Sequence, residues 1–286
     1  MKKEWHLTLS DNTGKIIRQI KGFNAYDSWH FLVRTKEILS IQNLEKKIKS
    51  KKYKFDNFFS QLPRKDKFLF LYFSILASKS IEIFELGSSS CEFIDGINLL
   101  KKITNQNIKL QYYGLDHSKL MNQIAKKIHP KENLMIYENL NQLKKLELKN
   151  FFLHDYGVSN YIFKDTKKFA QFMNEFNCGY SQMLFSKGNT IIRKQPSGKE
   201  ITFFSLPEFK KYYKYNIYFL FPTSSVKKWS AINKINKNSF ISGYFFFSRK
   251  SKDINKLKRY LNSSTKIKNY CKEINLQIKN LNDSFI

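Results

Sequence analysis

The sequence predicts an α/β fold, a mostly parallel β-sheet with helices on both faces. Two observations predict it. From about residue 80 to residue 185, short apolar segments alternate with segments of helical length, and the first two apolar segments end beside the acids Glu85 and Asp116. Such alternation implies parallel strands joined by right-handed crossovers, and sheets of this kind bind ligands beyond the carboxyl ends of their strands.

We expect three parts along the chain: a cap at 1–78, a sheet domain at 79–250 and a basic helical tail at 251–286. In the cap, LTLS and KIIRQI flank a turn at Asp11–Gly14, which predicts a β-hairpin. Helical patterns follow from Tyr26 to about Phe59 and again through the apolar run Phe68–Ala77.

The sheet domain begins with a regular series of strands and helices. Its apolar runs, helical spacings and a proline stop at Pro130 set the expected bounds. In chain order we expect strand Ile81–Leu86, helix Cys91–Ile103, strand Ile108–Leu115, helix Lys119–Ile128, strand Leu134–Tyr137, a weak helix at Asn141–Leu146, strand Phe151–His154, helix Asp165–Phe176 ended by Gly179, and strand Tyr180–Phe185.

After Phe185 the pattern changes. We expect an inserted hairpin at about 187–204 that turns at Pro196–Gly198, followed by a helix whose start is marked by the capping box Ser205–Glu208. Strands Asn216–Phe221 and Ser242–Ser248 come next, separated by a loop that contains Trp229, and Lys252–Asn280 reads as the basic helical tail.

The net charge of +28 suggests a nucleic-acid partner, but the composition offers another explanation. Lys, Asn, Ile and Phe are abundant while arginine, the usual reader of phosphates and bases, is scarce. Drift in an A/T-rich genome produces the same bias, and the charge would then be a solvated surface. Both explanations stay open.

Cysteine usage and the apolar runs indicate a cytoplasmic protein without a membrane span. Cys91, Cys178 and Cys271 form no close pair, so they predict neither a disulfide framework nor a zinc site. The first residues contain no apolar signal region, and the run Phe68–Ala77 is about half the length that a bilayer requires.

The segment IEIFELGSSS is the first that carries chemistry. Gly87 lets the chain turn under a ligand without a Cβ in the way, and Ser89 with Glu92 forms a predicted capping box. A pyrophosphate prefers a bare, positive helix start, whereas Glu92 and Asp95 place negative charge there. The pattern therefore favours a nucleoside ligand with an ammonium group, which would tolerate Glu85 nearby.

The second such segment is GLDHSKLMNQIAKKI. Asp116 ends its strand, where a carboxylate can accept both hydroxyls of a ribose. It could instead cap the next helix, although Ser118 is available for that. Glu138 and Asn139 follow the third strand and could contact a purine edge, while His117 flanks the expected pocket.

Together ELGSSS, GLDHSKLMNQIAKKI, the Glu138 position, LHDYGV and GYFFFSRK resemble a class I S-adenosylmethionine-dependent methyltransferase over roughly residues 80 to 250, with a loose similarity to bacterial sugar O-methyltransferases. The resemblance implies a Rossmann-like sheet with an antiparallel last strand and S-adenosylmethionine as cofactor. The residues that it implies are Glu85, Gly87 and Ser88 for the methionine part, Asp116 for the ribose, Glu138 or Asn139 for the adenine, and His154 with Asp155 where the fourth strand delivers substrate or catalytic groups.

The resemblance leaves the acceptor open. HDYG lacks the prolines of the enzymes that methylate nucleic-acid amino groups, which favours a sugar or other small-molecule hydroxyl, with His154 as base and Asp155 as helper. An RNA methyltransferase that uses the basic surface is the second reading. The third is an inactive binding protein, because serines at 88–90 stand where the family has further glycines.

Overall fold

The computed structural model describes the sheet region of the chain and little of the first 79 residues. The described residues are 6–10, 16–21, 43, 46, 80–89, 91–104, 109–130, 134–137, 143, 146–195, 198–214, 216–221, 223–262, 265, 268, 269, 272 and 277–280. The helices predicted between Tyr26 and Ala77 therefore lie, but for two residues, outside the described part of the chain.

The chain forms two compact units, each described by itself below. Unit 1 takes Met1–Trp29, Asp155–Lys250 and Lys272–Ile286, and unit 2 takes His30–His154 and Ser251–Cys271. The boundary near the middle of the chain falls at the peptide bond between His154 and Asp155, inside a single strand.

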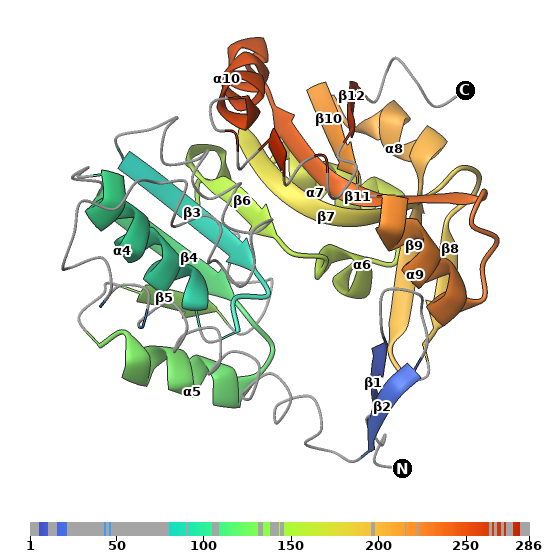
Figure 1. The fold of residues 1–286 in the computed structure, drawn as a ribbon, viewed down its shortest axis with the longest axis horizontal. Coiled ribbons are helices and arrows are strands. Elements are labelled where there is room, and N and C mark those ends of the chain that lie inside the picture. The colour runs from blue at the N-terminus through green and yellow to red at the C-terminus, as the bar shows by residue number, and fades with distance from the viewer. Residues whose placement is uncertain are drawn as a thin grey trace. The chain divides into compact units, whose positions relative to one another are not determined.

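Unit 2 is the parallel part of the fold (Figure 1). Its strands lie in the order β6-β3-β4-β5, and β3–β4 and β4–β5 are parallel pairs. The elements are β3 (Ser80–Leu86), α4 (Glu92–Thr104), β4 (Lys109–Leu115), α5 (Lys119–Ile128), β5 (Leu134–Tyr137), the 3-10 turn η2 (Leu148–Asn150), β6 (Phe152–Asp155) and α10 (Ser251–Leu261). Consecutive buried residues such as Ile83 and Phe84 point to opposite faces of β3, so both of its faces are covered, as parallel strands require.

Helix α5 shows how the sequence sets these bounds. Ser118 caps its first turn, because the Ser118 hydroxyl accepts the backbone N–H of Met121 at 3.2 Å. Met121 and Ala125 face the core, and Lys126 and Lys127 in the last turn complement the helix dipole. The helix begins and ends at the predicted residues.

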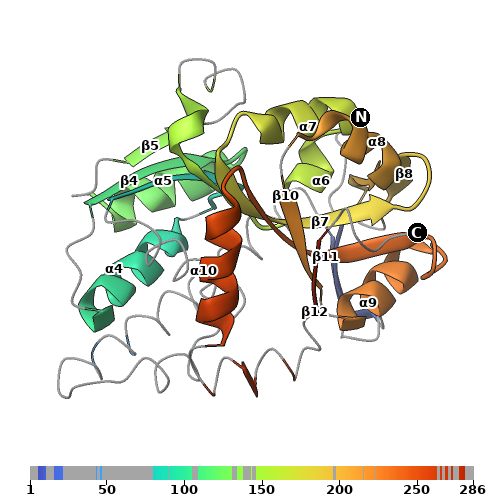
Figure 2. The same ribbon diagram turned by 90° about the horizontal axis from the view of Figure 1, so that it is seen from above.

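Unit 1 carries the antiparallel part of the fold (Figure 2). Its main strands lie in the order β7-β11-β10-β12, with β11 antiparallel to both neighbours and β12 antiparallel to β10. The elements are β1 (His6–Ser10), β2 (Ile16–Lys21), α6 (Ser159–Ile162), α7 (Thr166–Asn174), β7 (Cys178–Ser186), β8 (Ile191–Lys194), β9 (Glu200–Ser205), α8 (Leu206–Tyr212), β10 (Asn216–Phe221), α9 (Thr223–Asn233), β11 (Phe240–Ser248) and β12 (Gln277–Asn280).

The core of unit 1 is built from phenylalanine rings. Phe169 of α7 stacks on Phe204 of β9 with ring centroids 4.2 Å apart, and Phe185 of β7 meets Phe209 of α8 at 4.9 Å. All four side chains are fully buried. Burying one such ring stabilises the fold by about 1.5–3 kcal/mol, so the phenylalanine-rich composition has a structural use here.

The predicted α/β class is confirmed, including the antiparallel last strand, the N-terminal hairpin and the inserted hairpin β8–β9. Four details differ. Gly179 lies inside β7 and does not end α7, Trp229 lies on α9 where a loop was expected, and β12 lies in the predicted helical tail. Helix α6 was not predicted. Within the described ranges no helix is long and apolar enough to cross a membrane.

Candidate functional site

The turn after β3 folds over the end of β4. In the parallel register Leu86 lies beside Leu115, so the two strands end together. Gly87 then turns with φ 77°, a conformation that glycine adopts without strain. The backbone N–H groups of Gly87 and Ser88 both donate to the carbonyl of Leu115, at 2.7 and 3.1 Å. The predicted ligand turn is therefore fixed to the neighbouring strand.

Asp116 fastens this turn to helix α5. One carboxylate oxygen accepts the backbone N–H of Ser89 and the other accepts that of Ser118, each at 2.8 Å. Its side chain is almost wholly buried, while His117 beside it is exposed and places Nδ1 3.6 Å from the carboxylate. Each oxygen keeps a second lone pair, so the predicted ribose contact is compatible with these bonds.

The predicted capping box at Ser89 is wrong. Helix α4 begins at Glu92, and Ser89 has a left-handed φ of 50° while its N–H binds Asp116. The hydroxyls of Ser88 and Ser89 are buried and form no hydrogen bond with any described residue. A buried hydroxyl without a partner costs about 1–3 kcal/mol, so packing of the turn alone does not explain these two serines. The argument against a pyrophosphate then rests on the negative charge of Glu92 and Asp95 near the start of α4, not on a capped helix.

Gly114 of β4 makes room for Ser88. A Cβ atom at Gly114 would lie 2.7 Å from both Cβ and Oγ of Ser88, closer than real Cβ contacts. Ser88 thus lies directly against the backbone of β4, and any side chain at Gly114 would push the turn outward.

Glu85 and His154 form a buried pair in unit 2. Nδ1 of His154 lies 3.2 Å from one carboxylate oxygen of Glu85, and the Tyr112 hydroxyl donates to the other. The His154 ring stacks on Phe93 with centroids 4.2 Å apart. Burial, and then the neighbouring Cys91 and Glu85, raise the pKa of Tyr112 well above its usual value, so the phenol stays protonated and donates. No local pattern in the sequence pairs Glu85 with His154.

Asp155 is bound within unit 1. Its Oδ1 accepts the N–H groups of Val158 and Ser159 at 2.8 and 3.3 Å, and Oδ2 accepts the hydroxyl of Ser181. Burial raises the pKa of Asp155, and hydrogen bonds from Ser159, Ser181 and Val158 oppose that rise. These bonds fix the start of α6 to β7. A catalytic role for Asp155 stays a prediction.

The other expected ligand residues are not described. Glu138 and Asn139 lie outside the described residues, so the predicted adenine contact stays a prediction. Where side chains are described, no cluster of three His, Cys, Asp or Glu could hold a metal ion.

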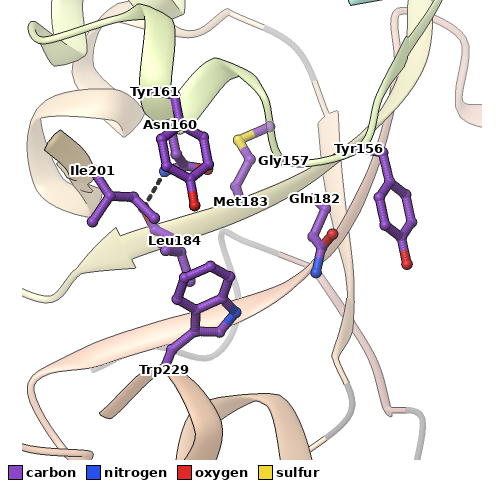
Figure 3. A pocket seen from close by; sticks show the side chains of 9 residues that line it. All are labelled: Tyr156, Gly157, Asn160, Tyr161, Gln182, Met183, Leu184, Ile201 and Trp229. Carbon is purple, nitrogen blue, oxygen red and sulfur yellow. Dashed lines mark hydrogen bonds between the residues drawn. The ribbon is translucent and has the colours of Figure 1, made fainter. Parts of the chain in front are cut away.

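A pocket that the sequence did not reveal lies in unit 1, between α6, β7, β9 and α9 (Figure 3). Its volume is about 140 Å³. The lining residues are Tyr156, Gly157, Asn160, Tyr161, Gln182, Met183, Leu184, Ile201 and Trp229. No motif in the sequence marks these positions.

Comparisons with known proteins identify similar folds. No family model and no curated protein matches the chain. Among solved structures, coclaurine N-methyltransferase with S-adenosylhomocysteine bound has 10% identity and a TM-score of 0.44, over 78% of this chain and 95% of that one. StiE O-MT has 7% identity and a TM-score of 0.46, over 71% and 81%. A SAM-dependent methyltransferase from Aquifex aeolicus has 12% identity and a TM-score of 0.34, over 64% and 93%. Because these identities are so low, the comparisons assign no role to any residue of this chain. The roles proposed below rest on this chain's own geometry.

Proposed function

We propose that the protein is an S-adenosylmethionine-dependent methyltransferase that methylates a hydroxyl of a sugar or another small molecule. The observation that carries the proposal is the turn after β3, which is fixed to the end of β4, fastened by Asp116 and lined by the buried hydroxyls of Ser88 and Ser89. Such a turn at the carboxyl edge of a parallel sheet is where a nucleoside ligand binds.

Different residues of this site would contact different parts of the cofactor. The turn Gly87–Ser89 would lie against its amino-acid end, and Asp116 would accept a ribose hydroxyl. Bound there, the cofactor supplies an electrophilic methyl group whose bond to sulfur breaks as a bond to the acceptor oxygen forms. The protein's main task is then to hold both partners in line.

The acceptor hydroxyl must lose its proton, and His154 is the proposed base. Nδ1 of His154 lies 3.2 Å from a carboxylate oxygen of Glu85, so a neutral ring protonated at Nδ1 would leave the lone pair on Nε2. His154 is fully buried, however, so the geometry equally supports a second role, in which His154 positions Glu85. His154→Gln separates these roles. A base gives a lower kcat with unchanged cofactor affinity, whereas a positioning residue gives weaker cofactor binding.

Calorimetric titration with S-adenosylhomocysteine tests the proposal. Asp116→Asn should weaken binding by roughly ten- to a hundredfold, since it removes charge-assisted bonds and sets an amide N–H group against a backbone donor. Asp165→Asn is the matched control, because Asp165 accepts the N–H of Lys168 at 2.7 Å in the first turn of α7 in unit 1. The absence of heat and of any thermal shift with millimolar cofactor would refute the proposal.

A further inference from the structure

The pocket in unit 1 arises from a fork between two strands. β9 runs parallel to β7 only at Phe185–Ser186, and further back it pairs with β8 instead. At the fork the Asn160 side chain of α6 spans the gap, because its Nδ2 donates to the carbonyls of Leu184 and Thr202 at 3.3 and 2.6 Å. Asn160 is almost wholly buried. The amide therefore bridges the two strands where they separate, at the edge of the pocket.

Aromatic side chains approach this space from two helices. In Figure 3 the ring of Tyr161, on α6, and the indole of Trp229, on α9, point toward one another. Gln182 of β7 lies at another part of the lining, beside Gly157, where an added Cβ atom would lie 3.5 Å from Oε1 of Gln182. At about 140 Å³ the pocket is smaller than the roughly 300–1,000 Å³ of whole-ligand sites, so it suits a single ring.

No lining residue of the pocket carries a charge at neutral pH, although the chain has 51 basic and 23 acidic residues. The hydroxyl of Tyr161 donates to Gln195 at 3.3 Å, and burial raises the pKa of Tyr161 to about 12, so it stays neutral. Lys199 lies with Nζ 5.9 Å from the centre of the Tyr161 ring but does not line the pocket.

We propose that this pocket binds an uncharged six-membered ring that bears hydroxyl groups. The faces of Trp229 and Tyr161 would contact the ring, and Gln182 would bind its hydroxyls. An anion would find no cation in the lining. Aromatic rings attract cations, but a cation would find no carboxylate there and a net charge of +28 around it.

Fluorescence of Trp229 tests this binding directly. The chain has three tryptophans, so a Trp5→Phe, Trp29→Phe background leaves Trp229 as the reporter. Four probes are titrated to about 10 mM, where weak fragments still bind: methyl glucoside, catechol, glucose 6-phosphate and choline. We expect saturable changes with the first two. Their relative affinity tells a sugar from a phenolic ring.

Substitutions of lining residues test whether the probes bind in this pocket. By ligand-observed NMR, Trp229→Ala and Gln182→Leu should each weaken the neutral probes by roughly tenfold. Ile192→Ala, an exposed position on β8 that does not line the pocket, should have no effect and is the control. The inference is overturned if neither neutral probe binds, if a charged probe binds as tightly, or if both pocket variants behave as Ile192→Ala.

Titration of the same proteins with S-adenosylhomocysteine separates this inference from the proposed function. Cofactor binding without ring binding refutes only the pocket's role. Ring binding without cofactor binding refutes the methyltransferase and leaves a ring-binding protein.

Discussion

The contact between Gly114 and Ser88 gives the most direct test of the candidate cofactor turn. Gly114→Ala adds one methyl group at a strand position without positive φ, so the backbone itself accepts the change. The new Cβ would nevertheless lie 2.7 Å from two atoms of Ser88. Ser88 cannot easily retreat, because its N–H binds Leu115 and its carbonyl accepts the N–H of Cys91 at 2.8 Å.

Two opposing terms set the size of the effect. Overpacking a buried site costs about 1–3 kcal/mol, while alanine in place of glycine recovers about 0.4–1 kcal/mol by restricting the unfolded chain. We therefore expect Gly114→Ala to lower the free energy of unfolding by roughly 1–2 kcal/mol. Displacement of the turn should also weaken binding of S-adenosylhomocysteine by about tenfold or more.

The assay is a double-mutant cycle read by thermal unfolding and by calorimetric titration. Ser88→Gly removes the atoms in conflict, so the double variant Gly114→Ala, Ser88→Gly should regain stability relative to Gly114→Ala alone. Gly188→Ala is the matched control, since nothing lies within 4 Å of a Cβ there. Equal effects at Gly114 and Gly188, or no recovery in the double variant, would refute the reasoning.

Three further predictions concern charge and burial. Because the folded-state pKa of Asp155 is raised, the folded protein holds this proton more tightly, so wild-type stability falls as pH rises from about 3.8 through that raised pKa; urea unfolding across this range should show a flatter profile for Asp155→Asn. His154→Ala leaves Glu85 buried without its histidine and should cost about 3 kcal/mol in urea unfolding, whereas exposed His117→Ala should change stability by less than about 0.5 kcal/mol. Ring binding in unit 1 should not change between about pH 6 and 9, because Tyr161 titrates near 12; a pH-dependent affinity would contradict the neutral pocket.

The sequence predicted most of the regular elements that lie between β3 and β11. Strands such as β5 and helix α5 match their expected bounds because a local signal sets each end, as Ser118 does for α5. Helix α9 was not predicted, because it lacks such local signals. Its first turn contains two serines and its apolar residues are few, so the segment around Trp229 reads as a loop.

The site was harder to predict, because its contacts join distant residues. Ser89 and Glu92 have the spacing of a capping box, but Asp116, 27 residues away in sequence, takes the N–H of Ser89 instead. The pair of Glu85 and His154 likewise joins two strands that are far apart in the chain. The residue types at strand ends showed which side chains belong to the site. Which residue each of them contacts depends on the tertiary structure, so the sequence did not predict it.

The interleaving of the two units has a consequence for biosynthesis. Unit 2 is complete only when Ser251–Cys271 has been made, and unit 1 only after Lys272–Ile286. A nascent chain that has passed β6 thus holds neither unit whole, so the usual order in which an N-terminal domain folds before the next is synthesised does not apply. Unit 2 should acquire protease resistance only after Ser251–Cys271 has left the ribosome, and unit 1 only after Lys272–Ile286. Cutting the gene at His154 would yield two fragments that are each short of a piece, which makes this strand a poor place to divide the protein for study.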